Sequence, residues 1–211
     1  MKLKNLFETE YGNNVDLSNV DLFKLPTDLP DVINGNFYCY NNKLTSLKFC
    51  PSEVGGTFDC ADNKLTSLEH CPFKVADSFV CGYNRLTSLE HCPSEVGGDF
   101  FCSFNRLTSL EHCPSEVGGD FFCTRNKLTS LKDIHEQIKK IDGDFYCDGN
   151  PIKSHILGLI FVKIDGDIIT KLGDGNDVDK ILNIWKNQGR KGVLGCQREL
   201  IDAGYRDLAQ L

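Results

Sequence analysis

A short phrase returns along this chain every 21 residues, and this interval constrains the fold more than any other feature. Each copy contains a cysteine, then an asparagine three residues later and a leucine two residues beyond the asparagine. The cysteines of the five evenly spaced copies are Cys39, Cys60, Cys81, Cys102 and Cys123. Because a fixed period of about 20 to 50 residues is typical of stacked supersecondary units, the chain is predicted to form a solenoid.

The copy that spans residues 100–114 predicts how each unit folds. Phe100 and Cys102 are two residues apart, so a short strand would place both side chains on its inner face and Phe101 on its outer face. Two leucines three residues apart then complete the apolar core. The segment Cys-Pro-Ser-Glu-Val-Gly-Gly returns the chain to the next strand, and its glycine pair is expected to supply positive φ angles.

The asparagine of each copy is expected to pair its side-chain amide with backbone groups that the bend would otherwise bury unpaired. Repetition of this position predicts a ladder of amides along the solenoid. A leading copy keeps only the spacing of Leu17, Leu22 and Leu25, and the last copy follows a longer step of 24 residues. The asparagines of the predicted ladder are Asn42, Asn63, Asn84, Asn105, Asn126 and Asn150.

The phrase F-x-C-x-x-N-x-L-x-x-L resembles the leucine-rich repeat pattern, with phenylalanine and cysteine in two of the apolar strand positions. The short return with its proline is similar to the bacterial class of that family. The resemblance implies an α/β repeat solenoid with short parallel strands on the concave face, extended convex returns and helical caps. The phrases Gly-Gly-Asp-Phe and Asn-x-Leu-Thr-Ser-Leu resemble repeat proteins of tailed bacteriophages. The family is chiefly a binding scaffold, so the resemblance indicates fold more than function.

Three segments are predicted: an N-terminal cap over residues 1–16, the repeat solenoid over 17–152 and a helical C-terminal cap or tail over 153–211. The N-terminal cap is expected to contain a short amphipathic helix with Leu3, Leu6 and Phe7 facing the first coil. Apolar spacing in the tail predicts two helices, one after Asp177 and one later. Their apolar residues are Val178, Ile181, Leu182 and Trp185, followed by Leu200, Ile201, Tyr205 and Leu208.

Charge and hydropathy exclude several classes of function. A formal net charge of −7 argues against nucleic acid as a partner, because binding to phosphates needs clustered lysine and arginine. No apolar stretch is long enough to predict a membrane span, and the first ten residues do not predict a signal peptide. We therefore expect a cytoplasmic protein. A basic group in the tail is interpreted as a solvated helix face: Lys180, Lys186, Arg190, Lys191 and Arg198.

The eleven cysteines are predicted to be reduced and packed, since identical positions of parallel coils stack at strand spacing and a buried thiol behaves as a small hydrophobe. Glu-His-Cys recurs three times, yet adjacent ligands in extended chain diverge, so no metal is predicted there. The acidic run at residues 174–179 is read as a turn before a helix, because Val178 stands where a calcium loop needs oxygen. No cofactor is expected.

Outward positions of the strands vary between copies, and they are predicted to carry specificity. Aromatic and arginine side chains at the centre of a surface are typical anchors of protein interfaces. Aspartates border them at positions 59, 62, 99, 120, 144 and 148. Carbohydrate stacking, and coverage of the aromatics by the protein itself, are the alternatives. The predicted protein-binding residues are Tyr38, Tyr40, Asp59, Tyr83, Phe101, Phe104, Phe122, Arg125 and Tyr146.

The sequence thus predicts a non-enzymatic protein-binding leucine-rich repeat protein. The bacteriophage-like phrases suggest that it is phage-encoded and binds, and thereby inhibits, a bacterial host protein such as a defence factor. One alternative is an enzyme or effector whose activity lies in the tail, around Cys196 and His155. Another is a self-assembling structural protein, and homodimerisation through the tail is a further expectation.

Overall fold

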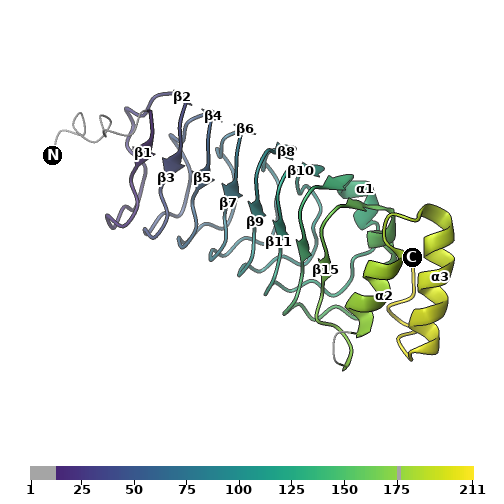
Figure 1. Cartoon of the computed structure of the whole chain (residues 1–211). Helices are drawn as coiled ribbons and strands as arrows, with labels where there is room; N and C mark the ends of the chain where they lie inside the picture. Colours follow the sequence, from purple (N-terminus) through teal and green to yellow (C-terminus); the bar gives the residue numbers. More distant parts are fainter. Residues whose placement is uncertain (1–12, 175–176) are drawn as a thin grey trace.

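Two parallel β-sheets run along the whole repeat region and make the chain a solenoid (Figure 1). The computed structural model describes residues 13–174 and 177–211, so the predicted helix with Leu3, Leu6 and Phe7 lies outside the described residues. Successive coils contribute two-residue strands to both sheets, and within the described residues the last strand, β15, has no counterpart in the second sheet. The eight-stranded sheet contains β1 (Val15–Asp16), β3 (Phe37–Tyr38), β5 (Phe58–Asp59), β7 (Phe79–Val80), β9 (Phe100–Phe101), β11 (Phe121–Phe122), β13 (Phe145–Tyr146) and β15 (Ile168–Ile169).

The second sheet is formed by the return segments, which are extended rather than helical, as the sequence predicted. Equivalent residues of successive repeats pair in register, so that Glu95 lies opposite Glu116 just as Phe100 lies opposite Phe121. The seven-stranded sheet contains β2 (Val32–Ile33), β4 (Glu53–Val54), β6 (Lys74–Val75), β8 (Glu95–Val96), β10 (Glu116–Val117), β12 (Lys140–Ile141) and β14 (Lys163–Ile164).

The core consists of identical side chains stacked between the two sheets. The strand phenylalanines are fully buried, and the centroids of neighbouring rings lie 5.0–5.9 Å apart. The cysteine of each phrase is buried beside them, which confirms the inward orientation predicted for both residues. All cysteines of the described residues are free thiols. The stacked phenylalanines are Phe37, Phe58, Phe79, Phe100, Phe121 and Phe145.

The asparagine ladder is confirmed. The side-chain amide of Asn105 donates to the carbonyl oxygens of Cys81 and Cys102, each at 3.1 Å. Its Oδ1 accepts the backbone N–H of Leu86 at 2.9 Å. One buried side chain therefore satisfies backbone groups of two adjacent coils, and its neighbours in the ladder repeat the pattern. Such multiple pairing explains why an amide occupies this position in the interior.

The glycine pairs of the returns are needed for a reason other than the predicted one. None of them has a positive φ angle. A Cβ atom on Gly97 would instead lie 2.1 Å from the carbonyl oxygen of Ala76, and one on Gly118 would lie 2.2 Å from that of Gly97. At these two glycines the neighbouring coil lies too close for a side chain, although the equivalent positions of other coils carry Asn34, Ala76 and Asp142. The prediction of positive φ was therefore wrong, and close backbone approach is the cause.

The solenoid extends one coil beyond the predicted boundary at residue 152, because β14 and β15 continue both sheets. The repeat phrase has been replaced there by Ile168, Ile169 and Thr170, which keep the burial pattern but not the residue types. At the other end, β1 begins before the predicted boundary at residue 17. The helical elements are α1 (Ile134–Gln137), the 3₁₀ helix η2 (Leu157–Phe161), α2 (Asp177–Trp185) and α3 (Gly189–Asp202).

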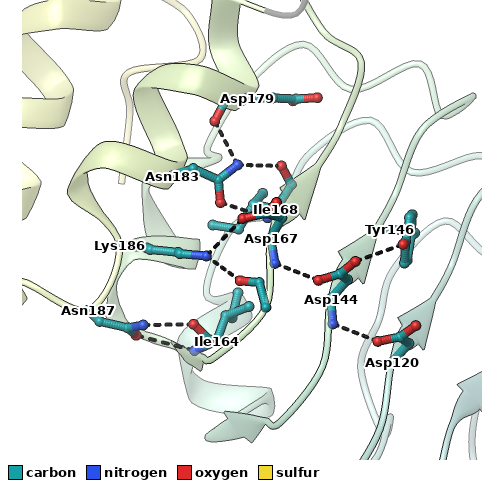
Figure 2. Close-up of polar contacts among 11 residues, drawn as sticks. Asp120, Asp144, Tyr146, Ile164, Asp167, Ile168, Asp179, Asn183, Lys186 and Asn187 are labelled. Carbon is teal, nitrogen blue, oxygen red and sulfur yellow. Dashed lines mark hydrogen bonds and ion pairs between the residues drawn. The ribbon is translucent and has the colours of Figure 1, made fainter.

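Two side-chain amides, one in helix α2 and one just after it, pair with the last edge strands of the two sheets (Figure 2). Asn183 accepts the N–H of Ile168 and donates to its carbonyl oxygen, both at 2.9 Å. Asn187, just beyond the helix, does the same for Ile164 at 3.2 and 2.7 Å. Each amide takes the place that a further strand would occupy, so the edges of β15 and β14 are paired at these residues.

The predicted tail helices correspond to α2 and α3, and they pack at the C-terminal end of the solenoid (Figure 1). Helix α2 contacts β15, while α3 contacts α2 and η2. Val178, Leu182 and Leu200 are buried as the apolar spacing predicted, whereas Tyr205 and Leu208 lie after the end of α3. Within the described residues, no helix combines the length and the apolar character that a membrane span requires.

Candidate functional site

The variable outward residues of the eight-stranded sheet lie side by side because the strands are in register. Equivalent positions of β3 to β13 form one continuous line: Tyr38, Asp59, Val80, Phe101, Phe122 and Tyr146. Tyr40, Tyr83, Phe104 and Arg125 follow these strands within three residues. We call the surface formed by all of these residues the aromatic face. All nine predicted binding residues lie in strands of this sheet or within three residues of them.

Aromatic rings of successive coils stack on one another along this line. The ring centroids of Phe101 and Phe122 are 5.4 Å apart, and those of Phe122 and Tyr146 are 4.7 Å apart with an interplanar angle of 10°. All three side chains are half-buried. Phe122 lies between the rings of Phe101 and Tyr146, so both of its faces have a ring neighbour.

Gly82 is a component of this face that sequence reasoning missed. A Cβ atom at this position would lie 2.3 Å from the ring of Phe101. The other coils carry a side chain at the same position, for example Ser103 and Thr124. The absence of a side chain at Gly82 therefore gives the Phe101 ring the space in which it lies. A departure from the repeat, a single glycine between a strand and an aromatic residue, was the available signal.

Three consecutive coils place unfavourable residue types in a left-handed backbone conformation. Tyr83, Phe104 and Arg125 have φ angles of 54°, 58° and 51°. A residue with a bulky side chain loses about 1–2 kcal/mol there, whereas asparagine, aspartate and glycine adopt the conformation readily. Equivalent positions of other coils carry those favourable types: Asn41, Asp62 and Gly149.

These three side chains also contact one another. The rings of Tyr83 and Phe104 stack at 4.2 Å, and the guanidinium carbon of Arg125 lies 5.3 Å from the centroid of Phe104. Tyr83 is 49% exposed, and Arg125 is exposed as well. Backbone strain at exposed residues does not stabilise the fold. Strain of this kind tends to occur at functional sites, so the trio marks the most informative part of the aromatic face.

A second ladder is built from aspartates of successive coils, and Figure 2 shows its last members, Asp120, Asp144 and Asp167. Oδ1 of Asp99 accepts the backbone N–H of Asp120 at 2.8 Å, and Oδ1 of Asp120 accepts that of Asp144 at 2.7 Å. Asp144 accepts the N–H of Asp167 and, through Oδ2, the hydroxyl of Tyr146 at 2.7 Å. The bond from the hydroxyl to Asp144 raises the pKa of Tyr146 to about 12. Three of the predicted border aspartates, Asp99, Asp120 and Asp144, thus have a structural role as well.

The N-terminal part of the aromatic face differs from the rest. Tyr38 and Tyr40 meet at an interplanar angle of 73° with centroids 6.3 Å apart. Asp59 and Val80 separate this pair from the stacked rings of the later coils. Burial raises the pKa of the Asp59 carboxyl group. The predicted residues therefore form two groups on one surface rather than a single cluster.

The residues of the alternative predictions are arranged less favourably for chemistry. The Cys196 side chain is buried, and burial raises its pKa to about 12, so the thiol carries its proton at neutral pH. His155 Nδ1 lies 2.8 Å from the hydroxyl oxygen of Ser154. Among residues 13–174 and 177–211, no cluster of three or more histidine, cysteine, aspartate or glutamate side chains is suited to a metal ion.

Comparison with known proteins assigns the fold. No family model and no curated protein matches the chain. Among solved structures, the leucine-rich-repeat domain of a Shigella effector is 25% identical, with a TM-score of 0.57 over 74% of this chain and 67% of that one. YopM from Yersinia enterocolitica is 15% identical, with a TM-score of 0.36 over 76% of this chain and 45% of that one. The chain is a leucine-rich repeat solenoid of the bacterial type, as the repeat phrase predicted.

Proposed function

We propose that this protein acts by binding another protein through the aromatic face, without catalysing a reaction. The observation that carries the proposal is the trio of Tyr83, Phe104 and Arg125, which strains the backbone in order to present a stacked cation and two rings to solvent. Aromatic and arginine side chains are the residue types that dominate the binding energy of protein interfaces. The half-buried rings of Phe101, Phe122 and Tyr146 extend the same surface.

The arrangement of the rings favours a protein over a sugar or a nucleobase. Sugars and bases bind aromatic residues by stacking on an open ring face. In this surface the faces of Phe122 and Phe104 are covered by neighbouring rings or by Arg125, so the ring edges are what a ligand meets. Edges suit edge-to-face contacts with the aliphatic and aromatic groups of a protein. The net charge of −7 also opposes a polyanionic partner.

We propose a bacterial host protein, such as a defence factor, as the class of partner, inhibited through stoichiometric occupancy. Two resemblances support this step: the bacteriophage-like repeat phrases, and the fold shared with the leucine-rich-repeat domain of a Shigella effector. Action in a reducing cytoplasm fits eleven unpaired thiols. The aromatic face is proposed to be the concave side of the solenoid. Homodimerisation through the tail stays a prediction.

An affinity capture from bacterial lysate tests the proposal. The wild-type protein is compared with a variant that combines Phe101→Ala, Phe122→Ala and Tyr146→Ala, none of which removes a core residue. A matched control carries three substitutions on the outward line of the seven-stranded sheet: Glu53→Ala, Lys74→Ala and Glu95→Ala.

Captured proteins are quantified by mass spectrometry after circular dichroism has confirmed that all three proteins are folded. We expect one or a few partners that are retained by the wild type and the control and lost by the aromatic variant. Equal capture by the aromatic variant would contradict a role for this surface.

A further inference from the structure

Tyr38 and Tyr40 differ from the other aromatic residues of the face in that neither ring packs against a ring of a neighbouring coil. Among the described residues, the only aromatic side chain near either of them is the other, and the two meet nearly edge to face. The neighbours of Tyr40 on the adjacent coils are Ser18 and Ala61, both small. The ring faces here are therefore not used for stacking between coils, in contrast to those of Phe122.

Carboxylates lie on both sides of the pair. The register of β1, β3 and β5 puts Asp16 and Asp59 on the coils before and after Tyr38. Burial, followed by the charges of Asp59 and Asp16, raises the pKa of the Tyr38 hydroxyl. Oδ1 of Asp59 accepts the N–H of Ala61 at 2.9 Å.

No cation compensates these acids within the described part of the chain. Neither Asp16 nor Asp59 forms a salt bridge there. Lys43, which follows Tyr40 by three residues, is paired with Asp21 at 2.8 Å and lies 5.5 Å from the centroid of Phe23. A half-buried carboxylate beside tyrosine rings that pack against no ring of another coil is an environment in which a cation gains both a charge partner and a ring face.

We propose that Tyr38, Tyr40 and Asp59, supported by Asp16, form a subsite for one cationic side chain of the partner, the guanidinium of an arginine or the ammonium of a lysine. The inference rests on the proposed function and deepens it. The aromatic face then has two halves: the coils around Tyr38 receive a cation, and the coils around Phe101 and Phe122 receive apolar groups. Asp59 is the residue that selects for positive charge.

The test uses two defined probes, the blocked peptides acetyl-Gly-Arg-Gly-amide and acetyl-Gly-Glu-Gly-amide, added to the ¹⁵N-labelled full chain. We expect the arginine peptide, at millimolar concentration, to shift the amide signals of residues around 38–61, and the glutamate peptide to leave them unchanged. Asp59→Asn keeps the Oδ1 acceptor for Ala61 and removes the charge. This substitution is expected to lower the affinity for the arginine peptide by at least about threefold. The control Asp28→Asn, at an exposed position outside the aromatic face, should leave that affinity unchanged.

The subsite would be refuted if both peptides shifted the amide signals equally, or if Asp59→Asn bound the arginine peptide as tightly as the wild type does. Tyr38→Leu provides a second check, because it keeps the acids and removes the ring, and it is expected to abolish the shifts. The Phe101→Ala, Phe122→Ala, Tyr146→Ala variant separates this inference from the proposed function. This variant should lose the captured protein and still bind the arginine peptide. Retained capture with intact peptide binding would refute the proposed function alone, and lost capture with no peptide binding by the wild type would refute the subsite alone.

Discussion

Alkaline pH is expected to unfold this protein far more steeply than an ordinary domain of its size. All eleven cysteines are free, and burial raises the pKa of every one of these thiols. The pKa reaches about 12 for Cys71, Cys113 and Cys196. In the unfolded chain the same thiols titrate near about 8.5. The folded state therefore holds protons that the unfolded state releases.

The sign and size of the effect follow from this difference. Because the folded pKa is the higher one, the stabilisation is fully present below the unfolded pKa and is lost as the pH rises toward the folded pKa. At about pH 9.5 each thiol has lowered the unfolding free energy of the protein by about 1.4 kcal/mol relative to neutral pH. Eleven thiols together lose about 15 kcal/mol, which equals or exceeds the whole stability of a typical domain, about 5–15 kcal/mol. Unfolding is therefore expected between about pH 9 and pH 10.

Urea denaturation in the presence of a phosphine reductant, followed by circular dichroism at a series of pH values, measures this loss. A variant with Cys102→Ala and Cys123→Ala serves as the control for mechanism. The cavities make this variant less stable than the wild type at neutral pH. Near about pH 9.5, however, its unfolding free energy should decrease with pH less steeply than that of the wild type, by about 2.5 kcal/mol per pH unit. A denaturation midpoint that stays constant from neutral pH to about pH 9.5 would refute the reasoning.

Three further substitutions test the ladder, the aromatic face and the cap. Asn105→Ala leaves buried groups of two coils unpaired and should lower the unfolding free energy by about 3–5 kcal/mol in urea, whereas the exposed Asn34→Ala should change it by less than about 0.5 kcal/mol. Gly82→Ala displaces the Phe101 ring and should cost about 1–3 kcal/mol, seen as a lower melting temperature; an unchanged value would contradict the contact. Asn183→Ala opens the edge of β15, so hydrogen exchange at the amide next to it should accelerate, and unchanged protection would argue against the cap.

The repeat phrase made much of the fold predictable, because each of its fixed residues has one physical task in every coil. Phe100 and Cys102 are two residues apart and therefore face the core, and Asn105 pairs its side-chain amide with backbone groups of its own coil and of the preceding coil. The binding residues were predicted from the variable positions of the repeat, because a position that changes from copy to copy is not part of the stacked core and should point outward. These predictions needed only the period and the alternation of a strand.

What the sequence did not predict depends on contacts between coils that the pattern does not encode. The glycine pairs are required because a Cβ atom would collide with the backbone of the preceding coil, as at Gly97, and none of them has a positive φ angle. Asn183 and Asn187 have the spacing of any polar helix face, and their role follows only from where α2 docks. The final coil escaped prediction because Ile168 replaces the phenylalanine that marks the other copies.

The central claim is that the aromatic face is the contact surface for a protein partner, and site-specific photocrosslinking tests it most directly. A photoreactive phenylalanine replaces Tyr83, which is 49% exposed on the face, or Phe73, which is 64% exposed next to β6 of the other sheet. Both proteins are irradiated in bacterial lysate, and adducts are identified by mass spectrometry. The account predicts a discrete protein adduct at position 83 that is missing at position 73. Adducts at position 73 alone, or equal labelling at both positions, would contradict it.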